Sequence, residues 1–567
     1  MTTLFARVFG LAGFSNLSST AAASAAGART PARSERRLRG GGAMAIALLL
    51  LLGAPVLGYA QYEVLYNFCS QANCADGGEP RNVNLIQDAS GNFYGTSSNG
   101  GAYGGGTVFK VDPTGHETVL YSFCGLTNCA DGAHPYAGLI EDSAGDLYGT
   151  TNQGGAYGGG TVFMVDATET ETVIYSFCSV ANCADGAGPV AGLILDSGGT
   201  LYGTTASGGN PGPANSGGGG VVFKVDTSGV ETVLYAFCPS APSCLDGVYP
   251  LGGVIRDSSG NLYGTTEAGG TGSVGTVFEV DSSNNETVLY SFCNVSGCKD
   301  GNYPQAGVVA DAAGNLYGTT EFGGANYESG GVFKLAPPGQ PGGDWTETTL
   351  YSFCNAPSCA DGYFPLSGLI QDAAGNLYGT TEFGGTGSGG SGTVYKVDGS
   401  GNETVLYIFC SAANCTDGEN PFGGVTRDAG GNLYGTALGG GSAGGGVVYK
   451  IAAEVAVTPA SVNFGNVELC HPKKEVLTVT NNSSAKVHLG PISFVDVVGN
   501  PNDFNFHEYC NKGTINPGAS CFIGVKFSPD ALKTDSATLD IVTSAPGSPL
   551  LVPITATGVA DPNCHRQ

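Results

Sequence analysis

The sequence contains few charged residues and very few basic ones. Asp, Glu, Lys and Arg make up 12% of the 567 residues, and 22 basic residues stand against 48 acidic ones. This low charged fraction, beside 41% aliphatic, aromatic and Cys residues, excludes a solvated acidic tail and a coiled coil. Without the first 60 residues, 16 basic and 47 acidic residues remain, and the formal charge falls from −26 to −31. Such an acidic surface repels phosphate backbones, so we expect no nucleic-acid partner.

Residues and motifs that commonly perform catalysis are also scarce. The repeated region described below holds two His residues, His116 and His134, and neither recurs from repeat to repeat. The motif H-E-x-x-H is absent, and the glycine runs precede strand-like segments and lack Gly-Lys-Ser/Thr, so they predict no phosphate site. We identify no catalytic residue from the sequence and favour a protein that is not an enzyme. Carboxylates brought together from different repeats would escape this test, so a carbohydrate-active hydrolase or lyase that uses carboxylates in the propeller channel is the alternative to an extracellular binding, adhesion or structural scaffold protein.

Glycine and cysteine, in contrast, are plentiful and regularly placed. Seven cysteine pairs recur 54 to 61 residues apart, each followed by one residue and then Asp-Gly. Each repeat holds four β-type runs, seen in one copy as ETVLYSFC, AGLIED, GDLYGT and GTVFMVD, bounded by turn residues. Four strands per unit in seven units predict an all-β protein with a seven-bladed β-propeller over residues 61–452.

The order of the runs predicts how the ring closes. The run after each Pro resembles the innermost strand of NHL-type propeller repeats, which makes ETVLYSFC the outermost strand. The first run, Tyr62–Cys69, then has no inner partners, and the last three runs, from Pro421 to Ile451, lack an outer strand. We expect Tyr62–Cys69 to pair beside Gly446–Ile451, which leaves no exposed sheet edge.

Over residues 62–452, the segments LYGTT-x-x-GG, GTVFKVD and ETVLYSFC resemble the GloVer-type tandem repeat of bacterial choice-of-anchor proteins. The resemblance implies an exported, anchored or surface-associated repeat protein without an established activity.

The glycine-rich pattern ends near residue 453, and alternating runs such as CFIGVKFSP and SATLDIV predict an immunoglobulin-like β-sandwich over residues 453–560. The segments SVNFGNV, VKFSPD and ITATGVA, with Cys510 and Cys521, resemble the ASH/Hydin class of such domains, which implies an adhesive or spacer role. Residues 561–567 form a tail.

The first 60 residues have the pattern of a leader with a secretory signal peptide. A basic stretch, Arg33–Arg39, precedes the apolar run Ala43–Leu57 and small residues up to Ala60. We expect the mature chain to begin near Gln61, to contain no membrane span and to be a monomer, secreted or held at the cell surface.

An exported chain with 18 cysteines favours disulfides, whereas structural zinc needs four ligands and commonly C-x2-C pairs. We therefore expect no metal at the cysteines, and we expect a bridge within each repeat and one in the sandwich. The expected pairs are Cys69 with Cys74, Cys124 with Cys129, Cys178 with Cys183, Cys238 with Cys244, Cys293 with Cys298, Cys354 with Cys359, Cys410 with Cys415, and Cys510 with Cys521. Cys470 with Cys564 is a weaker pairing.

Neighbouring strands of a blade run in opposite directions, so the loops from an outer strand to the next inner strand leave the ring on the same side as the loops between second and third strands. The cysteine loops and the glycine-rich loops therefore share one face of the ring, which we call the cysteine-loop face. We expect any ligand there, held by side chains that follow each Pro and by acids of the Asp-Gly loops: Tyr136, Leu251, Gln305, Leu366, Phe422, Asp131, Asp246, Asp300, Asp361 and Asp417. A glycan or a surface protein is the expected partner, no cofactor is expected, and Ca2+ is an open alternative. Two structural interpretations compete with this one: the Asp residues are turn residues, and the residues after Pro plug the channel.

Overall fold

The computed structural model describes residues 62–560, except residue 82 and the segments 210–216, 240–242, 326–328, 341, 386–389, 454, 460, 483–485, 511–512 and 544–549. The expected leader, the cleavage before Gln61 and the tail lie outside the described residues. Helix in the described residues is confined to short 3-10 turns, and none of them has the length of a membrane-spanning helix.

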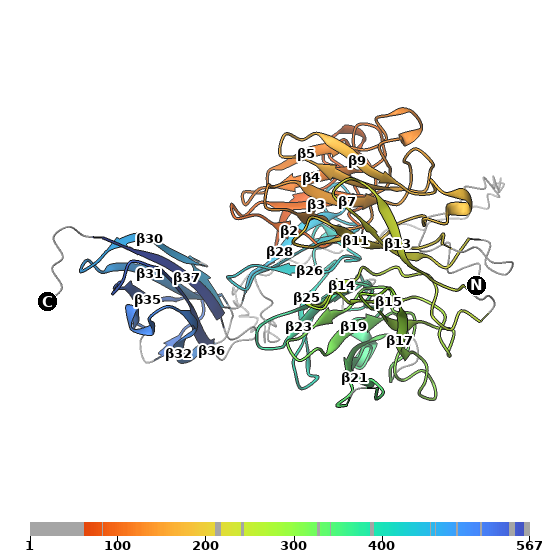
Figure 1. The fold of residues 1–567 in the computed structure, drawn as a ribbon. Coiled ribbons are helices and arrows are strands. Elements are labelled where there is room, and N and C mark those ends of the chain that lie inside the picture. Colours follow the sequence, from red (N-terminus) through yellow and green to blue (C-terminus); the bar gives the residue numbers. More distant parts are fainter. Residues whose placement is uncertain are drawn as a thin grey trace, which may run out of the picture. The chain divides into compact units, whose positions relative to one another are not determined.

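Residues 62–451 form seven four-stranded antiparallel sheets (Figure 1). Six sheets take their strands in sequence order, and the seventh takes its outer strand from the start of the repeats. The first strands are β2 (Ile86–Gln87), β6 (Ile140–Glu141), β10 (Ile194–Leu195), β14 (Ile255–Arg256), β18 (Val309–Ala310), β22 (Ile370–Gln371) and β26 (Val425–Arg427). The second strands are β3 (Phe93–Ser97), β7 (Leu147–Thr151), β11 (Leu201–Thr205), β15 (Leu262–Thr266), β19 (Leu316–Thr320), β23 (Leu377–Thr381) and β27 (Leu433–Ala437).

The third strands are β4 (Thr107–Val111), β8 (Thr161–Val165), β12 (Val221–Val225), β16 (Thr276–Val280), β20 (Gly331–Ala336), β24 (Thr393–Val397) and β28 (Val447–Ile451). The fourth strands are β5 (Glu117–Ser122), β9 (Glu171–Ser176), β13 (Glu231–Ala236), β17 (Glu286–Ser291), β21 (Thr346–Ser352), β25 (Glu403–Ile408) and β1 (Tyr62–Asn67). The second and third strands are the most buried, which their apolar residues explain.

The recurring Leu-Tyr-Gly-Thr motif has a packing function in each second strand. A Cβ on Gly95 would lie 2.7 Å from Cζ of Phe109 on the neighbouring third strand, so only glycine leaves room for that ring. The Thr that follows donates a hydrogen bond to a carbonyl of the next sheet, as Thr96 does to Ala137 at 2.7 Å. The same bond recurs from Thr150, Thr204, Thr265, Thr319 and Thr380.

The last sheet contacts the first. Thr436 donates to the carbonyl of Pro80 at 3.5 Å, and the N–H of Gly424 donates to Oδ1 of Asn84 at 2.9 Å. β1 pairs with β28, Tyr62 opposite Ile451 and Asn67 opposite Val447. The expected pairing of the first run with the end of the repeats is therefore confirmed.

The expected division of loops between the two edges of the sheets is also confirmed. The N–H of Gly155, in a glycine-rich loop, donates to the carbonyl of Cys129 at 2.9 Å, so these two loop types meet at one edge. At the opposite edge, the N–H of Ala167 donates to Asp146, so the two hairpin turns of that sheet meet there.

Residues 455–559 form a sandwich of two sheets around one core. One sheet has the order β29 (Val455–Thr458), β31 (Lys473–Asn481), β35 (Ser520–Phe527), β33 (Phe504–Glu508). The other has the order β30 (Val462–Glu468), β37 (Leu550–Val559), β36 (Thr534–Thr543), β32 (Val487–Val498), β34 (Thr514–Ile515). The residues expected to share inward faces, such as Ile523 and Leu539, are fully buried.

Candidate functional site

Each cysteine loop is a closed six- or seven-residue ring that connects the fourth strand of one sheet to the next sheet. All eight expected bridges form, seven of them within single repeats. The bridges join Cys69 to Cys74, Cys124 to Cys129, Cys178 to Cys183, Cys238 to Cys244, Cys293 to Cys298, Cys354 to Cys359, Cys410 to Cys415, and Cys510 to Cys521. The expected pairing within each repeat is therefore confirmed.

The bridges close loops whose backbone is unusual. Cys124, Asn128 and Cys129 have φ values of 70°, 58° and 51°, a conformation that L residues rarely adopt and that the bridge helps to hold. The same left-handed conformation recurs at both cysteines of every pair in the repeats, including Cys74, Cys183, Cys244, Cys298 and Cys359. Cys470, in the sandwich, is also disulfide-bonded, and its expected partner Cys564 lies outside the described residues.

The Asp of each cysteine loop is engaged inside the loop. Asp131 is 0% exposed and accepts hydrogen bonds from the hydroxyl of Tyr121 at 3.0 Å and from the N–H groups of Gly125 and Leu126. Asp300, Asp361 and Asp417 repeat this arrangement, and Asp246, which is half-buried, binds Tyr235 and the N–H of Cys238. This is the geometry that the turn interpretation predicted. Ligand binding by these five Asp residues stays a prediction.

A second Asp series forms the hairpin turns at the opposite edge. Oδ1 of Asp88 accepts from the N–H groups of Ser90 and Asn92, and Oδ2 accepts from the hydroxyl of Tyr94 at 3.0 Å. These bonds lower the pKa of Asp88 despite its partial burial.

Between neighbouring sheets lie carboxylate clusters that the sequence analysis did not identify. Glu117 begins β5 and is 9% exposed, and its Oε1 is buried without a hydrogen-bond partner among the described residues. Burial, with the nearby charge of Asp76, raises the pKa of Glu117 to about 7. The signal was present in the sequence, because Glu stands at the same place in six repeats.

The other five Glu residues have similar environments. Burial and an Asp of the preceding sheet raise the pKa to about 7 or about 8 in each of them: Glu171, Glu231, Glu286, Glu347 and Glu403. In the seventh sheet Tyr62 takes this place, stacks on Tyr407 with ring centroids 3.9 Å apart, and donates to the carbonyl of Asp417. Only this interface carries no Glu, among the described residues.

Five of the first strands, β2, β6, β10, β14 and β18, contribute to the lining of a cavity of about 260 Å³. Gly138, Gly192, Gly253 and Gly307 line it together with Ala, Val, Leu and Ile residues, and the described lining contains one polar side chain, that of Asn84. No carboxylate belongs to the described lining. The cavity itself therefore offers shape and backbone groups rather than acid or base chemistry.

The residues that follow each Pro come shortly before the first strands, on the cysteine-loop face. Leu251 lines the cavity itself, and we call this end of the cavity its mouth. The five residues differ in exposure. Leu251 and Leu366 are each 6% exposed, as a channel plug requires, whereas Tyr136, Gln305 and Phe422 are half-buried. Gln305 donates from Nε2 to the carboxylate of Glu321.

Tyr136 and Phe422 meet at a residue that the sequence analysis missed, Arg81. Its Cζ lies 5.5 Å from the centroid of the Tyr136 ring and 5.4 Å from that of Phe422. Burial raises the pKa of Tyr136, and Arg81 partly offsets this shift. The sequence could have indicated Arg81, because it directly follows Pro80 in the first repeat just as Tyr136 directly follows Pro135 in the second.

The residues that precede each Pro form a second series at this mouth. Each lies in the left-handed region with φ from 52° to 62°, and its backbone is anchored: the N–H of Tyr303 donates to Val274 at 2.7 Å, and its carbonyl accepts from Glu321. The side chains differ in every repeat except one pair of Tyr residues: Glu79, His134, Gly188, Tyr249, Tyr303, Phe364 and Asn420.

Aromatic residues gather on one side of this face. Five rings from the fifth and sixth sheets form a chain, the aromatic arc, with centroids 4.8 to 6.0 Å apart: Tyr303, Phe322, Phe364, Tyr363 and Phe383. Glu267 lies in the equivalent loop of the fourth sheet, and burial raises its pKa to about 7.

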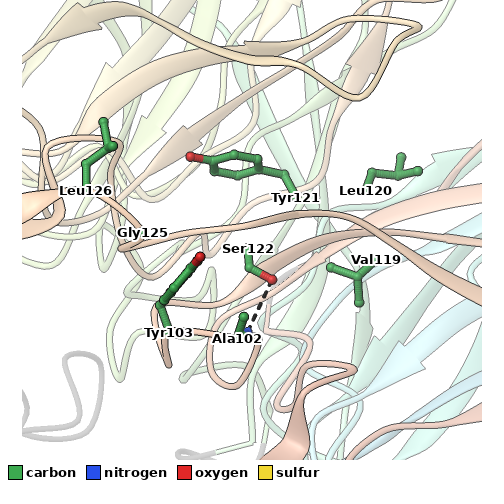
Figure 2. Close-up of a pocket in the computed structure, with 8 residues that line it drawn as sticks. All are labelled: Ala102, Tyr103, Val119, Leu120, Tyr121, Ser122, Gly125 and Leu126. Atoms are coloured by element: carbon green, nitrogen blue, oxygen red, sulfur yellow. Dashed lines mark hydrogen bonds between the residues drawn. The ribbon is translucent and has the colours of Figure 1, made fainter.

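A separate hollow of about 440 Å³ lies beside β5, away from the cavity lining (Figure 2). Tyr103 and Leu126, which are 62% and 58% exposed, flank it, and the N–H of Ala102 donates to Oγ of Ser122 at 3.3 Å. A Cβ on Gly125 would lie 2.9 Å from the Tyr103 ring, so the cysteine loop supports this ring directly.

Among the described residues, one group of three potential metal ligands occurs, Cys410, Cys415 and Glu419. Its two cysteines form a disulfide, so the group does not fit a metal ion.

The family model described as the Gloeobacter/Verrucomicrobia repeat matches residues 56–278 and 216–414. The chain belongs to this family. Membership in the Gloeobacter/Verrucomicrobia repeat family agrees with the resemblance seen in the repeats, and the family description names no activity. No curated protein matches the chain in sequence.

Several solved structures resemble parts of the chain weakly. The ASH/PapD-like domain 7 of human CEP192 is 15% identical over 19% of this chain and 87% of its own, with a TM-score of 0.16. A PL25 ulvan lyase is 9% identical over 70% and 95%, with a TM-score of 0.36. The secreted serine protease VesC from Vibrio cholerae is 11% identical over 55% and 66%, with a TM-score of 0.17. Scores this low carry no weight for fold or function.

Proposed function

We propose that the chain is an exported extracellular binding protein that holds a glycan at the mouth of its cavity, on the cysteine-loop face. In this proposal the seven sheets are the blades of a seven-bladed β-propeller. The hydrogen bonds from each sheet to the next, the bond from Thr436 back to Pro80 and the pairing of β1 with β28 support a closed ring. The two-sheet sandwich supports an immunoglobulin-like spacer of the ASH class.

The cysteine chemistry supports an extracellular location. Eight disulfides occur among the described residues, and such bonds persist in oxidising compartments. The acidic charge disfavours nucleic acid, and the protein acts as a monomer without a cofactor.

One observation carries the binding proposal. The residues that precede each Pro at the cavity mouth have the same backbone conformation in every repeat, but their side chains differ. The backbone of Tyr303 and its equivalents is anchored in the same way, yet these positions carry acidic, basic, aromatic and amide groups. Repeats that anchor this backbone in the same way but carry different side chains on it present an asymmetric surface at the mouth. Aromatic rings beside carboxylates, as Tyr249 is beside Glu267, are the apolar and orienting groups that a sugar pocket combines.

The proposal is tested with the double variant Tyr136→Ala/Phe422→Ala. We expect lost binding to immobilised polysaccharides with a melting temperature close to that of the parent protein. The matched control is Tyr103→Ala/Tyr157→Ala, which removes two rings that are 62% and 60% exposed and lie outside the cavity lining. A double variant that binds normally, or one that loses stability together with binding, would assign the two rings to packing instead.

A carbohydrate-active hydrolase or lyase is the second candidate, and Glu267 is the observation that favours it. Its pKa of about 7 leaves it partly protonated at neutral pH, as a general acid requires. Polysaccharide breakdown by the parent protein but not by Glu267→Gln would support this candidate. Unchanged polysaccharide length with both proteins would exclude it.

A further inference from the structure

The two sheets of the sandwich present different surfaces to solvent. In the sheet β29-β31-β35-β33, the residues that alternate with the buried core residues include Lys474, Lys526 and His507 and, among the described residues, no acid. We call this outward surface of the four strands the lysine face. The outward surface of the other sheet does carry an acid, since Asp540 is an outward residue of β36. A sheet face without a carboxylate is unusual in a chain with 48 acidic and 22 basic residues.

The two lysines of this face stand directly opposite each other. Lys474 on β31 pairs in register with Lys526 on β35, and cross-strand neighbours of like charge destabilise a sheet. Lys474 is exposed and Lys526 is half-buried, and neither forms an ion pair among the described residues. Both ammonium groups are therefore open to an anion, which would remove their mutual repulsion.

The acids of the same strands lie on the other side. Glu475 is opposite Val525 and Glu508 is opposite Ile523, and both of these partners are fully buried. The two acids thus occupy the positions that alternate with the lysine face. Glu475 also has its own partner, Lys473, with Nζ and Oε1 3.5 Å apart.

Three large apolar side chains lie beside the lysines. Val476, Phe522 and Tyr509 are 56%, 49% and 64% exposed. Val476 is opposite Gly524, and a Cβ on Gly524 would lie 3.4 Å from Cε2 of Tyr509, so the Tyr509 ring stands over this glycine. His507 packs against the same ring edge to face, with ring centroids 4.6 Å apart. Single exposed apolar residues are common, whereas a contiguous group rimmed by polar residues marks an interaction surface.

The size of this surface decides between kinds of partner. Strands lie about 4.8 Å apart and rise about 3.3 Å per residue, so five residues along three strands cover roughly 200 Å². A stable protein–protein interface takes about 800 Å² from each partner, whereas a short run of linked sugars fits the smaller area.

The charge of the chain also disfavours a membrane as the partner. An anionic bilayer would bring a plane of negative charge against a chain of net charge −26. A single anionic polymer strand instead touches one face, and charges more than about 8 Å away are largely screened at physiological salt.

We propose that the lysine face binds an anionic polysaccharide. Lys474 and Lys526 bind its acidic groups as point charges, and the rings of Tyr509 and Phe522 pack against its sugars. This combination of an apolar surface with a few charged groups is the one that sugar sites use. The site goes beyond a spacer role for the sandwich and does not depend on glycan binding at the cavity mouth.

The first test varies the ligand and uses the mature protein. Binding is measured to polygalacturonate and its fully methyl-esterified form, and to dextran sulfate and dextran. At about 50 mM NaCl we expect at least one charged polymer to bind about ten-fold or more tightly than its neutral counterpart, and added salt to weaken this binding. The two pairs distinguish carboxylate from sulfate recognition.

Two further ligands represent the other classes of partner, poly-L-glutamate for an acidic protein and phosphatidylglycerol-containing vesicles for a membrane. We expect both to bind more weakly than the preferred charged polysaccharide. Tighter binding of either one through the lysine face would overturn the polysaccharide assignment.

The second test varies the protein. Lys474→Gln/Lys526→Gln is expected to lower affinity for the preferred charged polymer about ten-fold and to melt at or above the temperature of the parent, because it removes a like-charge pair. Tyr509→Ala/Phe522→Ala is expected to lower the same affinity several-fold and to keep its salt dependence. Lys486→Gln is the matched control, an exposed lysine that precedes β32 in the other sheet, and should bind normally.

The outcomes separate this inference from the proposed function. Tyr136→Ala/Phe422→Ala is expected to retain salt-sensitive binding of the charged polymer, whereas neutral polymers report on the cavity mouth alone. Failure of both charged polymers to bind better than their neutral forms, or normal binding by the lysine variant, would overturn this site and leave the mouth untouched. A lysine variant that loses binding and melting temperature together would assign the two lysines to the structure of the sheet.

Discussion

The pKa values of six Glu residues between the sheets, of which Glu117 is buried and the other five are half-buried, predict how stability depends on pH. Glu117 is 9% exposed, its Oε1 has no hydrogen-bond partner among the described residues, and Asp76 lies near it. Replacement by Gln keeps the shape and removes the charge. Because the folded state raises the pKa of this acid, folding is favoured when Glu117 is protonated, and stability falls as pH rises from 4.5 to about 7.

The size of the effect follows from the pKa. A rise in the pKa of Glu117 from 4.5 to about 7 lowers the free energy of unfolding at high pH by at most ~3.4 kcal/mol, at about 1.36 kcal/mol for each pKa unit. Water that reaches this interface screens the charge. We therefore expect Glu117→Gln to raise the free energy of unfolding by about 1–2 kcal/mol at pH 8 and to leave it unchanged near pH 4. Adding Glu286→Gln and Glu403→Gln, whose acids have pKa values of about 8, should raise the gain further.

The assay is scanning calorimetry of the parent protein and the variants at pH 4 and pH 8. We expect the triple variant to melt several degrees above the parent at pH 8 and close to it at pH 4, since a gain of 1 kcal/mol shifts the melting temperature of a large domain by about 2 °C. Glu63→Gln, at an exposed position of β1, is the control and should change neither value. A triple variant that melts below the parent by the same amount at both pH values would refute the reasoning.

Three further predictions concern the scaffold. Deleting residues 61–69 removes β1, and calorimetry should show a lower melting temperature for the repeats; an unchanged value would contradict the pairing with β28. Asp131→Ala leaves three donors of its loop without an acceptor and should destabilise by about 1–3 kcal/mol in chemical denaturation, whereas a neutral effect would show that the loop does not depend on it. N-terminal sequencing of exported protein should find a first residue near Gln61, and retention of Arg33–Arg39 would disprove cleavage.

The repeat architecture was predictable because the same sequence pattern occurs in all seven repeats. The cysteine pairs, the Gly-Thr of each second strand and the turn Asp residues predicted the strands, the bridges and the pairing of β1 with β28. A single copy would have been ambiguous, since the first strand of most sheets, such as Ile86–Gln87, is only two residues long.

The candidate site was harder to predict because its contacts join residues far apart in sequence. Arg81 meets Phe422 across 341 positions, and no local pattern marks that pair. The carboxylate clusters were missed for a different reason: a Glu in an outer strand is expected to be solvated, and only the packing of the next sheet buries it.

Hydrogen–deuterium exchange tests the central claim most directly, with the mature protein and a soluble form of a polysaccharide to which it binds in the immobilised-polysaccharide assay. The account predicts that bound polymer protects backbone amides around the cavity mouth, in residues 81–86, 136–140 and 422–426, and leaves the turns at Asp88, Asp142 and Asp428 unchanged. Protection confined to those turns or to the sandwich, with none at the mouth, would contradict it.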